Sequence, residues 1–139
     1  MLSFIKKYPA TLFTAAIIAV LSLMRIPELP PDIEVPLADK WTHMLMYGAL
    51  CFILWAEYWR CHSSDNRANR LGERVPHFAA FTALAIAAPI AWGGAMELMQ
   101  AYATTYRSGD WLDLVADIIG VLVATPVGIA FGRFIGMGK

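Results

Sequence analysis

Four long apolar stretches, separated by polar or proline-rich segments, make up most of the chain. They run from about Tyr8 to Met24, Ala38 to Trp59, His77 to Tyr102 and Trp111 to Phe134. Each is close to the roughly 20 residues that an α-helix needs to cross a hydrocarbon core of about 30 Å. Because a spanning backbone must satisfy its own hydrogen bonds, this pattern predicts an all-α fold, a bundle of four transmembrane helices.

The segments between the stretches predict surface loops. Ile26–Pro36 carries four prolines and is expected to be extended, Arg60–Pro76 is polar, and Ala103–Gly109 is short. The first stretch has the length of a signal-peptide core, but no clean small-x-small cleavage site follows it, so we expect an uncleaved helix. Residues 1–139 are therefore predicted to form a single transmembrane domain.

An excess of Lys and Arg on one side sets the orientation of the bundle. Of the 11 such residues, eight lie on the side of both termini (Lys6, Lys7, Arg60, Arg67, Arg70, Arg74, Arg133 and Lys139) and three on the other (Arg25, Lys40 and Arg107). The positive-inside rule places both termini in the cytoplasm. Aromatic residues agree, with Trp55, Tyr58 and Trp59 near the predicted inner boundary and Trp41, Tyr102, Tyr106 and Trp111 near the outer one.

The composition narrows the class of protein. Of the 139 residues, 58% are hydrophobic and only 16% are charged, which excludes a disordered chain. Lys and Arg number 11, as do Asp and Glu, so no overall basic field exists to attract nucleic acid. Cys51 and Cys61 are too few for a disulfide scaffold and lack the spacing of a metal-binding pair.

Small residues recur every four positions in the third and fourth stretches. They are Ala79, Ala83, Ala87, Ala91 and Ala95 in the third, and Ala116, Gly120, Ala124, Gly128, Gly132 and Gly136 in the fourth. Helices in a bilayer associate where small residues allow close backbone approach, so the two stripes predict a tightly packed antiparallel pair. Gly128–Gly132 suits contact between two copies equally well, which leaves a homo-oligomer open.

Ionisable side chains gather at the predicted outer ends of three stretches. Three helix faces carry them, formed by Asp39, His43 and Tyr47 with Lys40 alongside, by Glu97 and Gln100, and by Asp110, Asp113 and Asp117. A charge inside a membrane costs about 2.5–3.5 kcal/mol on insertion scales, so several of them indicate a functional site. Lys40, His43 and Arg107 can supply the compensating positive charge.

The direction of the third stretch helps to place these groups. Glu97 lies about 200° around its helix from the alanine stripe, which should contact the fourth stretch. We therefore expect the Glu97–Gln100 face to meet the Lys40–His43 segment. The two deeper aspartates of the fourth stretch, Asp113 and Asp117, should close the same outward-facing pocket from the side.

These residues also resemble the VanZ-like family of small bacterial membrane proteins. The resemblance is carried by Asp39-Lys40-Trp-Thr-His43 with Tyr47, by Glu97-Leu-Met-Gln100, and by the spacing of Arg107, Asp110, Asp113, Asp117 and Gly120, and it spans about Leu37 to Gly128. Asp117 departs from the family, which usually has Asn there. The family takes its name from an accessory protein of glycopeptide-antibiotic resistance, so the resemblance implies a cell-envelope role in the bacterial inner, or cytoplasmic, membrane.

The first functional hypothesis is an enzyme that acts on a membrane lipid head group or a lipid-linked envelope precursor, as a hydrolase or transferase. The candidate catalytic residues are His43, as general acid or base, with Glu97, Asp113 and Asp117. The candidate ligand-binding residues are Asp39, Lys40, Tyr47, Gln100, Arg107 and Asp110, with Lys40 and Arg107 as an anion clamp.

Three alternatives remain open. The cluster can bind a head group without catalysis, relay protons for transport, or act as a structural network of ion pairs that fixes helix register. No cofactor and no metal site are predicted. A divalent metal is the less favoured option, because the charges of Lys40 and Arg107 compete for the same carboxylates.

Overall fold

The computed structural model describes residues 2–24, 37–62, 67–68, 71–72, 75, 77–105 and 109–134. Within these ranges it contains no strand, and its helices are α1 (Leu2–Lys7), α2 (Pro9–Leu23), α3 (Ala38–Cys61), α5 (Phe78–Ala103) and α6 (Trp111–Phe134). The all-α prediction is therefore confirmed. The four predicted stretches correspond to α2, α3, α5 and α6, which begin and end close to the expected residues.

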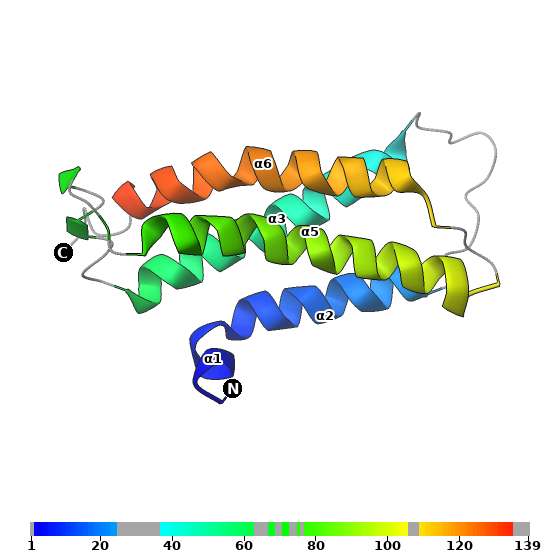
Figure 1. Ribbon diagram of the computed structural model, residues 1–139, viewed down its shortest axis with the longest axis horizontal. Coiled ribbons are helices and arrows are strands. Elements are labelled where there is room, and N and C mark those ends of the chain that lie inside the picture. Colours follow the sequence, from blue (N-terminus) through cyan, green and yellow to red (C-terminus); the bar gives the residue numbers. More distant parts are fainter. Residues whose placement is uncertain are drawn as a thin grey trace.

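The long helices alternate in direction (Figure 1). The starts of α3 and α6 lie at the same end of the bundle as the end of α5. The opposite end holds the end of α3, the start of α5 and the short helix α1. This arrangement brings the acidic segments of three helices to one end, as the sequence predicts.

The start of α2 is stabilised by a side chain from another helix. Pro9 occupies the first helical position, where its fixed φ suits the helix. The backbone N–H groups of Ala10 and Thr11 donate to the buried carboxylate of Glu57 in α3, each over 2.9 Å, and the Thr11 hydroxyl donates to it over 2.7 Å. Glu57 thus caps α2 and places negative charge at the positive end of the helix dipole.

The closest pair of helices is α3 with α6. A Cβ atom added to Gly120 would overlap the carbonyl group of Met44 in α3, so only glycine allows the two backbones to approach this closely. Further along the pair, Cβ atoms at Gly128 and Gly132 would come within 2.6 Å of the side chains of Trp55 and Trp59. The small-residue stripe of α6 is therefore a docking surface for α3.

The prediction that this stripe packs against the alanine stripe of α5 is wrong. The alanines at positions 79, 83, 87 and 91 of α5 are exposed. The face of α5 that is buried instead includes Gly93, Glu97 and Gln100. Burying two polar side chains on one face turns the opposite, alanine-bearing face outward, and the tryptophans of α3 fill the groove above the α6 glycines.

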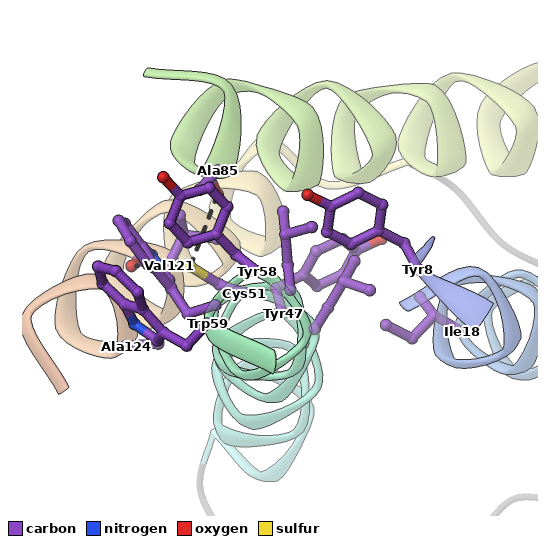
Figure 2. Packing of buried hydrophobic residues seen from close by; sticks show 12 residues of the cluster. Tyr8, Ile18, Tyr47, Cys51, Tyr58, Trp59, Ala85, Val121 and Ala124 are labelled. Carbon is purple, nitrogen blue, oxygen red and sulfur yellow. Dashed lines mark hydrogen bonds between the residues drawn. The ribbon is translucent and has the colours of Figure 1, made fainter. Parts of the chain in front are cut away.

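Aromatic side chains at the end of α3 form much of the core. Trp55 is fully buried and meets Phe81 edge to face with ring centroids 5.0 Å apart, while Tyr58 stacks on Phe81 at 3.8 Å. Trp59 donates a hydrogen bond from its ring nitrogen to the Gly128 carbonyl over 2.9 Å. Figure 2 shows Tyr58 and Trp59 within this cluster. All three aromatics are buried inside the bundle near the end of α3, so they pack against other helices rather than face outward.

The outer surface of the bundle is rich in apolar side chains. Phe13 of α2, Leu45 of α3, Leu98 of α5 and Val123 of α6 are each more than 60% exposed. Among the described residues, Phe78–Ala103 and Trp111–Gly132 are long and apolar enough to cross a membrane, and Pro9–Leu23 is a shorter apolar helix. These features support a membrane protein, the coarser part of the sequence prediction.

Candidate functional site

Lys40 lies at the centre of an ion-pair network between α3 and the start of α6. Its ammonium group contacts Asp113, donates to Asp110 over 2.7 Å and lies 3.5 Å from Asp39. Asp110 also accepts the backbone N–H of Leu112 over 2.9 Å and so caps α6. The hydrogen bond from Lys40 holds the pKa of the Asp110 carboxyl below its usual range.

His43 lies one turn deeper, between two aspartates of α6. Its Nδ1 is 3.1 Å from Oδ1 of Asp117, and its Nε2 is 3.7 Å from Oδ2 of Asp113. The contact between Nδ1 and Asp117 is a hydrogen bond, whereas Nε2 and the Asp113 oxygen are too far apart to form one. The ring of Tyr47 lies nearly parallel to the imidazole, with centroids 6.3 Å apart.

The cluster runs from an exposed rim into the bundle. Side-chain exposure falls from 55% at Asp39 and 38% at Asp110, through 22% at Lys40, to 4% at His43 and 0% at Asp117. The six residues Asp39, Lys40, His43, Asp110, Asp113 and Asp117, called the polar cluster below, are thus brought together as predicted. A chain of polar contacts links the surface to the protein interior.

Glu97 lies within electrostatic range of His43, whereas Gln100 takes a position different from the one expected. Glu97 Oε2 accepts the backbone N–H of Asp110 over 2.7 Å, and its charge interacts with His43 without a direct hydrogen bond between them. Gln100 is buried and donates to the carbonyl of Ser22 in α2 over 2.8 Å. The prediction that Gln100 meets His43 and Lys40 is therefore wrong, because Gln100 donates to a carbonyl at the end of α2 instead.

The anion clamp is only partly described. Arg107 lies outside the described residues. Lys40 is surrounded by carboxylates, so its charge is already neutralised by the protein. Among the described residues, the buried atoms Oε1 of Glu97 and Oδ2 of Asp117 accept no hydrogen bond. Among the described residues, the carboxyl groups around His43 outnumber the basic side chains.

Sequence reasoning missed two contributors to the region. Gly93 of α5 faces Asp117, and a Cβ atom there would overlap the Asp117 carboxylate, so this glycine makes room for a buried charge. Ser22 supplies the carbonyl that holds Gln100. A glycine four positions before Glu97 on the polar face of the third stretch was the signal that could have identified the first.

The donor atoms of Asp39, His43 and Asp113 lie within 4.8 Å of one another, so these three residues could hold a metal ion. They come from the starts of two helices that pack closely. The sequence analysis placed all three in the site but predicted no metal there.

A separate cavity of about 530 Å³ lies among α2, α3 and α5. Its lining includes Thr11, Leu50, Phe81 and Trp92, with Lys7 and His62 also present, and none of the polar cluster. The cavity and the polar cluster are therefore distinct regions.

No protein-family model, curated protein or solved structure matches the chain. The resemblance to the VanZ-like family accordingly rests on the sequence motifs described above.

Proposed function

We propose that this protein is a four-span integral protein of the bacterial cytoplasmic membrane that binds the head group of a membrane lipid or lipid-linked envelope precursor. The observation that carries the proposal is the polar cluster, which descends from exposed Asp39 to fully buried Asp117. Intramembrane ionisable groups are costly, and a connected set of them that reaches the surface suits a ligand with a polar head and an apolar tail.

The surface of the bundle supports four spans. Large apolar side chains are exposed on α2, α3, α5 and α6 alike, as expected for helices that face lipid tails. Trp41, Tyr102 and Trp111 are more than half exposed at the end that carries the polar cluster, where an aromatic belt would meet the lipid head groups. The Lys and Arg distribution supports an orientation with both termini in the cytoplasm and the cluster on the outer side.

His43 is the residue best placed for acid–base chemistry. Asp117 fixes the ring through Nδ1, and this leaves Nε2 directed toward Asp113 and the less buried part of the cluster. A buried histidine oriented by a carboxylate is a common arrangement for proton transfer. Hydrolysis or transfer at a head group is the enzymatic form of the proposal, with a role in glycopeptide-antibiotic resistance as the resemblance implies.

Binding without catalysis is the second candidate, and one observation favours it. Lys40, the described member of the predicted clamp, is neutralised by three carboxylates and so is not free to bind an anionic transition state. A site of this kind would hold a head group through hydrogen-bond donors or a positive group of the ligand.

The test is expression of the protein in a susceptible bacterial host and measurement of the minimum inhibitory concentration of a glycopeptide antibiotic. We expect expression to raise this concentration, and His43→Ala to return it to the vector-only value. His62→Ala is the matched control, because His62 lies at the other end of α3 and should leave resistance unchanged. Equal resistance of His43→Ala and the unmodified protein, at equal membrane abundance, would contradict the proposal.

A further inference from the structure

We propose that Asp39, His43 and Asp113 bind a divalent transition-metal ion, for which zinc and manganese suit the donors. One carboxylate oxygen from each aspartate and one nitrogen of the imidazole lie within 4.8 Å of one another. Imidazole favours zinc among the common ions, and carboxylate oxygens are accepted by both zinc and manganese.

The separation of His43 from Asp113 supports this assignment. Nε2 and Oδ2 are 3.7 Å apart, too far for a hydrogen bond. Zinc bonds to nitrogen and oxygen are each about 2.0–2.2 Å long, so two ligands at an angle of about 110–130° lie roughly 3.3–3.8 Å apart. The gap therefore has the size that an ion between the two donors requires.

The other side of the imidazole gives an independent argument. Nδ1 is hydrogen-bonded to Asp117, which is fully buried. Ligating histidines commonly donate their second ring N–H to a carboxylate, which fixes the tautomer and directs the lone pair of the other nitrogen to the metal. With the proton on Nδ1, the lone pair of Nε2 points toward Oδ2 of Asp113 and is available to a metal ion between the two atoms.

Buried oxygen atoms near His43 with unused hydrogen-bonding capacity also favour a cation. Buried oxygens of Asp117 and Glu97 accept no hydrogen bond from the described residues, and both carboxylates interact electrostatically with His43. Lys40 contacts Asp113 through Oδ1, while Oδ2 faces His43. The two oxygens of Asp113 can therefore serve Lys40 and the ion together.

This inference rests on the proposed function only for the identity of the ligand. In the ion-bound protein His43 is a ligand rather than a proton carrier, and the ion offers open positions to a phosphate or carboxylate of the head group. The anionic head group that a neutralised Lys40 cannot hold would then be held by the metal.

The experiment uses full-length protein purified in detergent without chelator. We expect elemental analysis to find about one zinc or manganese ion per chain, and the stripped protein to bind one Co²⁺ with visible absorption bands. His43→Ala and Asp113→Asn should each abolish binding, whereas His62→Ala should retain it. Asp117→Asn, which leaves all three ligands in place, should weaken Co²⁺ binding about 10–100-fold.

Absence of saturable Zn²⁺, Mn²⁺ and Co²⁺ binding by the folded protein would overturn the inference. Undiminished metal binding by both His43→Ala and Asp113→Asn would also overturn the inference. If either variant does not fold, the weaker Co²⁺ binding expected for Asp117→Asn provides the test. If His43→Ala loses resistance but the unmodified protein binds no metal, the proposed function is supported and the metal inference is overturned. Metal binding without any effect on resistance would leave only the metal site.

Discussion

A carboxylate is buried near each end of α3, and the two carboxylates differ in how completely they are hydrogen-bonded. At the cytoplasmic end proposed above, both oxygens of Glu57 accept hydrogen bonds from α2, and Arg60 lies 3.3 Å away. At the other end, buried Asp117 pairs through one oxygen only, and the second accepts no hydrogen bond from the described residues. Similar burial therefore accompanies complete pairing in one place and incomplete pairing in the other.

This difference separates a structural carboxylate from a candidate functional one. A buried charge whose hydrogen bonds are complete stabilises the helices that it joins. A buried charge with unused capacity reduces stability, and proteins commonly tolerate such groups where a ligand or a proton completes the set. Glu57 fits the first description, and the polar cluster fits the second.

The largest expected effect concerns the side of the membrane on which each end lies. Native Cys61 is exposed at the Glu57 end, and Cys51 is buried. In intact cells, a membrane-impermeant maleimide should leave both unlabelled. Tyr102→Cys, introduced at the most exposed aromatic position near the polar cluster, should be labelled almost completely.

Inside-out vesicles provide the reciprocal control. There Cys61 should react and the introduced cysteine should not, and Cys61→Ser should abolish the signal of the native protein. Labelling of Cys61 from outside intact cells would show that the proposed orientation is reversed.

The second prediction concerns the helix contact that carries the polar cluster. Gly120→Ala would place a methyl group against the Met44 carbonyl, and relief requires movement of α3 relative to α6. We expect a loss of about 3 kcal/mol of stability, together with loss of the His43–Asp117 contact. Gly94→Ala is the matched control, because the nearest atom to its Cβ is 4.0 Å away, and it should be neutral or slightly stabilising. Equal thermal midpoints for the two variants would contradict this packing.

Helix positions and the membership of the polar cluster could be predicted from sequence, because apolar length and four-residue spacing are local properties. The pairing of helices could not. Small residues repeat every four positions in both α5 and α6, so their spacing alone could not show which faces are in contact. The need to bury Glu97 and Gln100 decided which face of α5 turned inward. The partner of Gln100 could not be predicted either, because it is the backbone carbonyl of Ser22, a group that every residue of α2 carries.

The third prediction applies one substitution to each kind of carboxylate. In Glu57→Gln the new amide N–H must face an N–H of α2, because both oxygens of Glu57 are acceptors. We expect a loss of about 1–3 kcal/mol. In Glu97→Gln the oxygen that accepts the Asp110 N–H can be kept and a buried charge is removed, so the thermal midpoint should stay equal or rise.

Thermal unfolding in detergent, followed by circular dichroism, measures both variants under the same conditions. The order of their midpoints is the informative result. A midpoint for Glu97→Gln below that for Glu57→Gln would mean that Glu97 is at least as fully paired as Glu57 in the cap of α2.

The smallest effect is expected at the exposed rim of the polar cluster. Asp110→Asn keeps a side-chain oxygen for the Leu112 N–H and leaves Lys40 in contact with Asp113, so only part of one ion pair is lost. The decrease in thermal midpoint should be smaller than for Glu57→Gln. Because Lys40 lowers the pKa of Asp110, its contribution is present above the unfolded pKa of about 3.9 and disappears as the pH falls through the lower folded value. The difference between parent and variant should therefore shrink below about pH 4, and a difference that grew on acidification would contradict the Lys40–Asp110 pair.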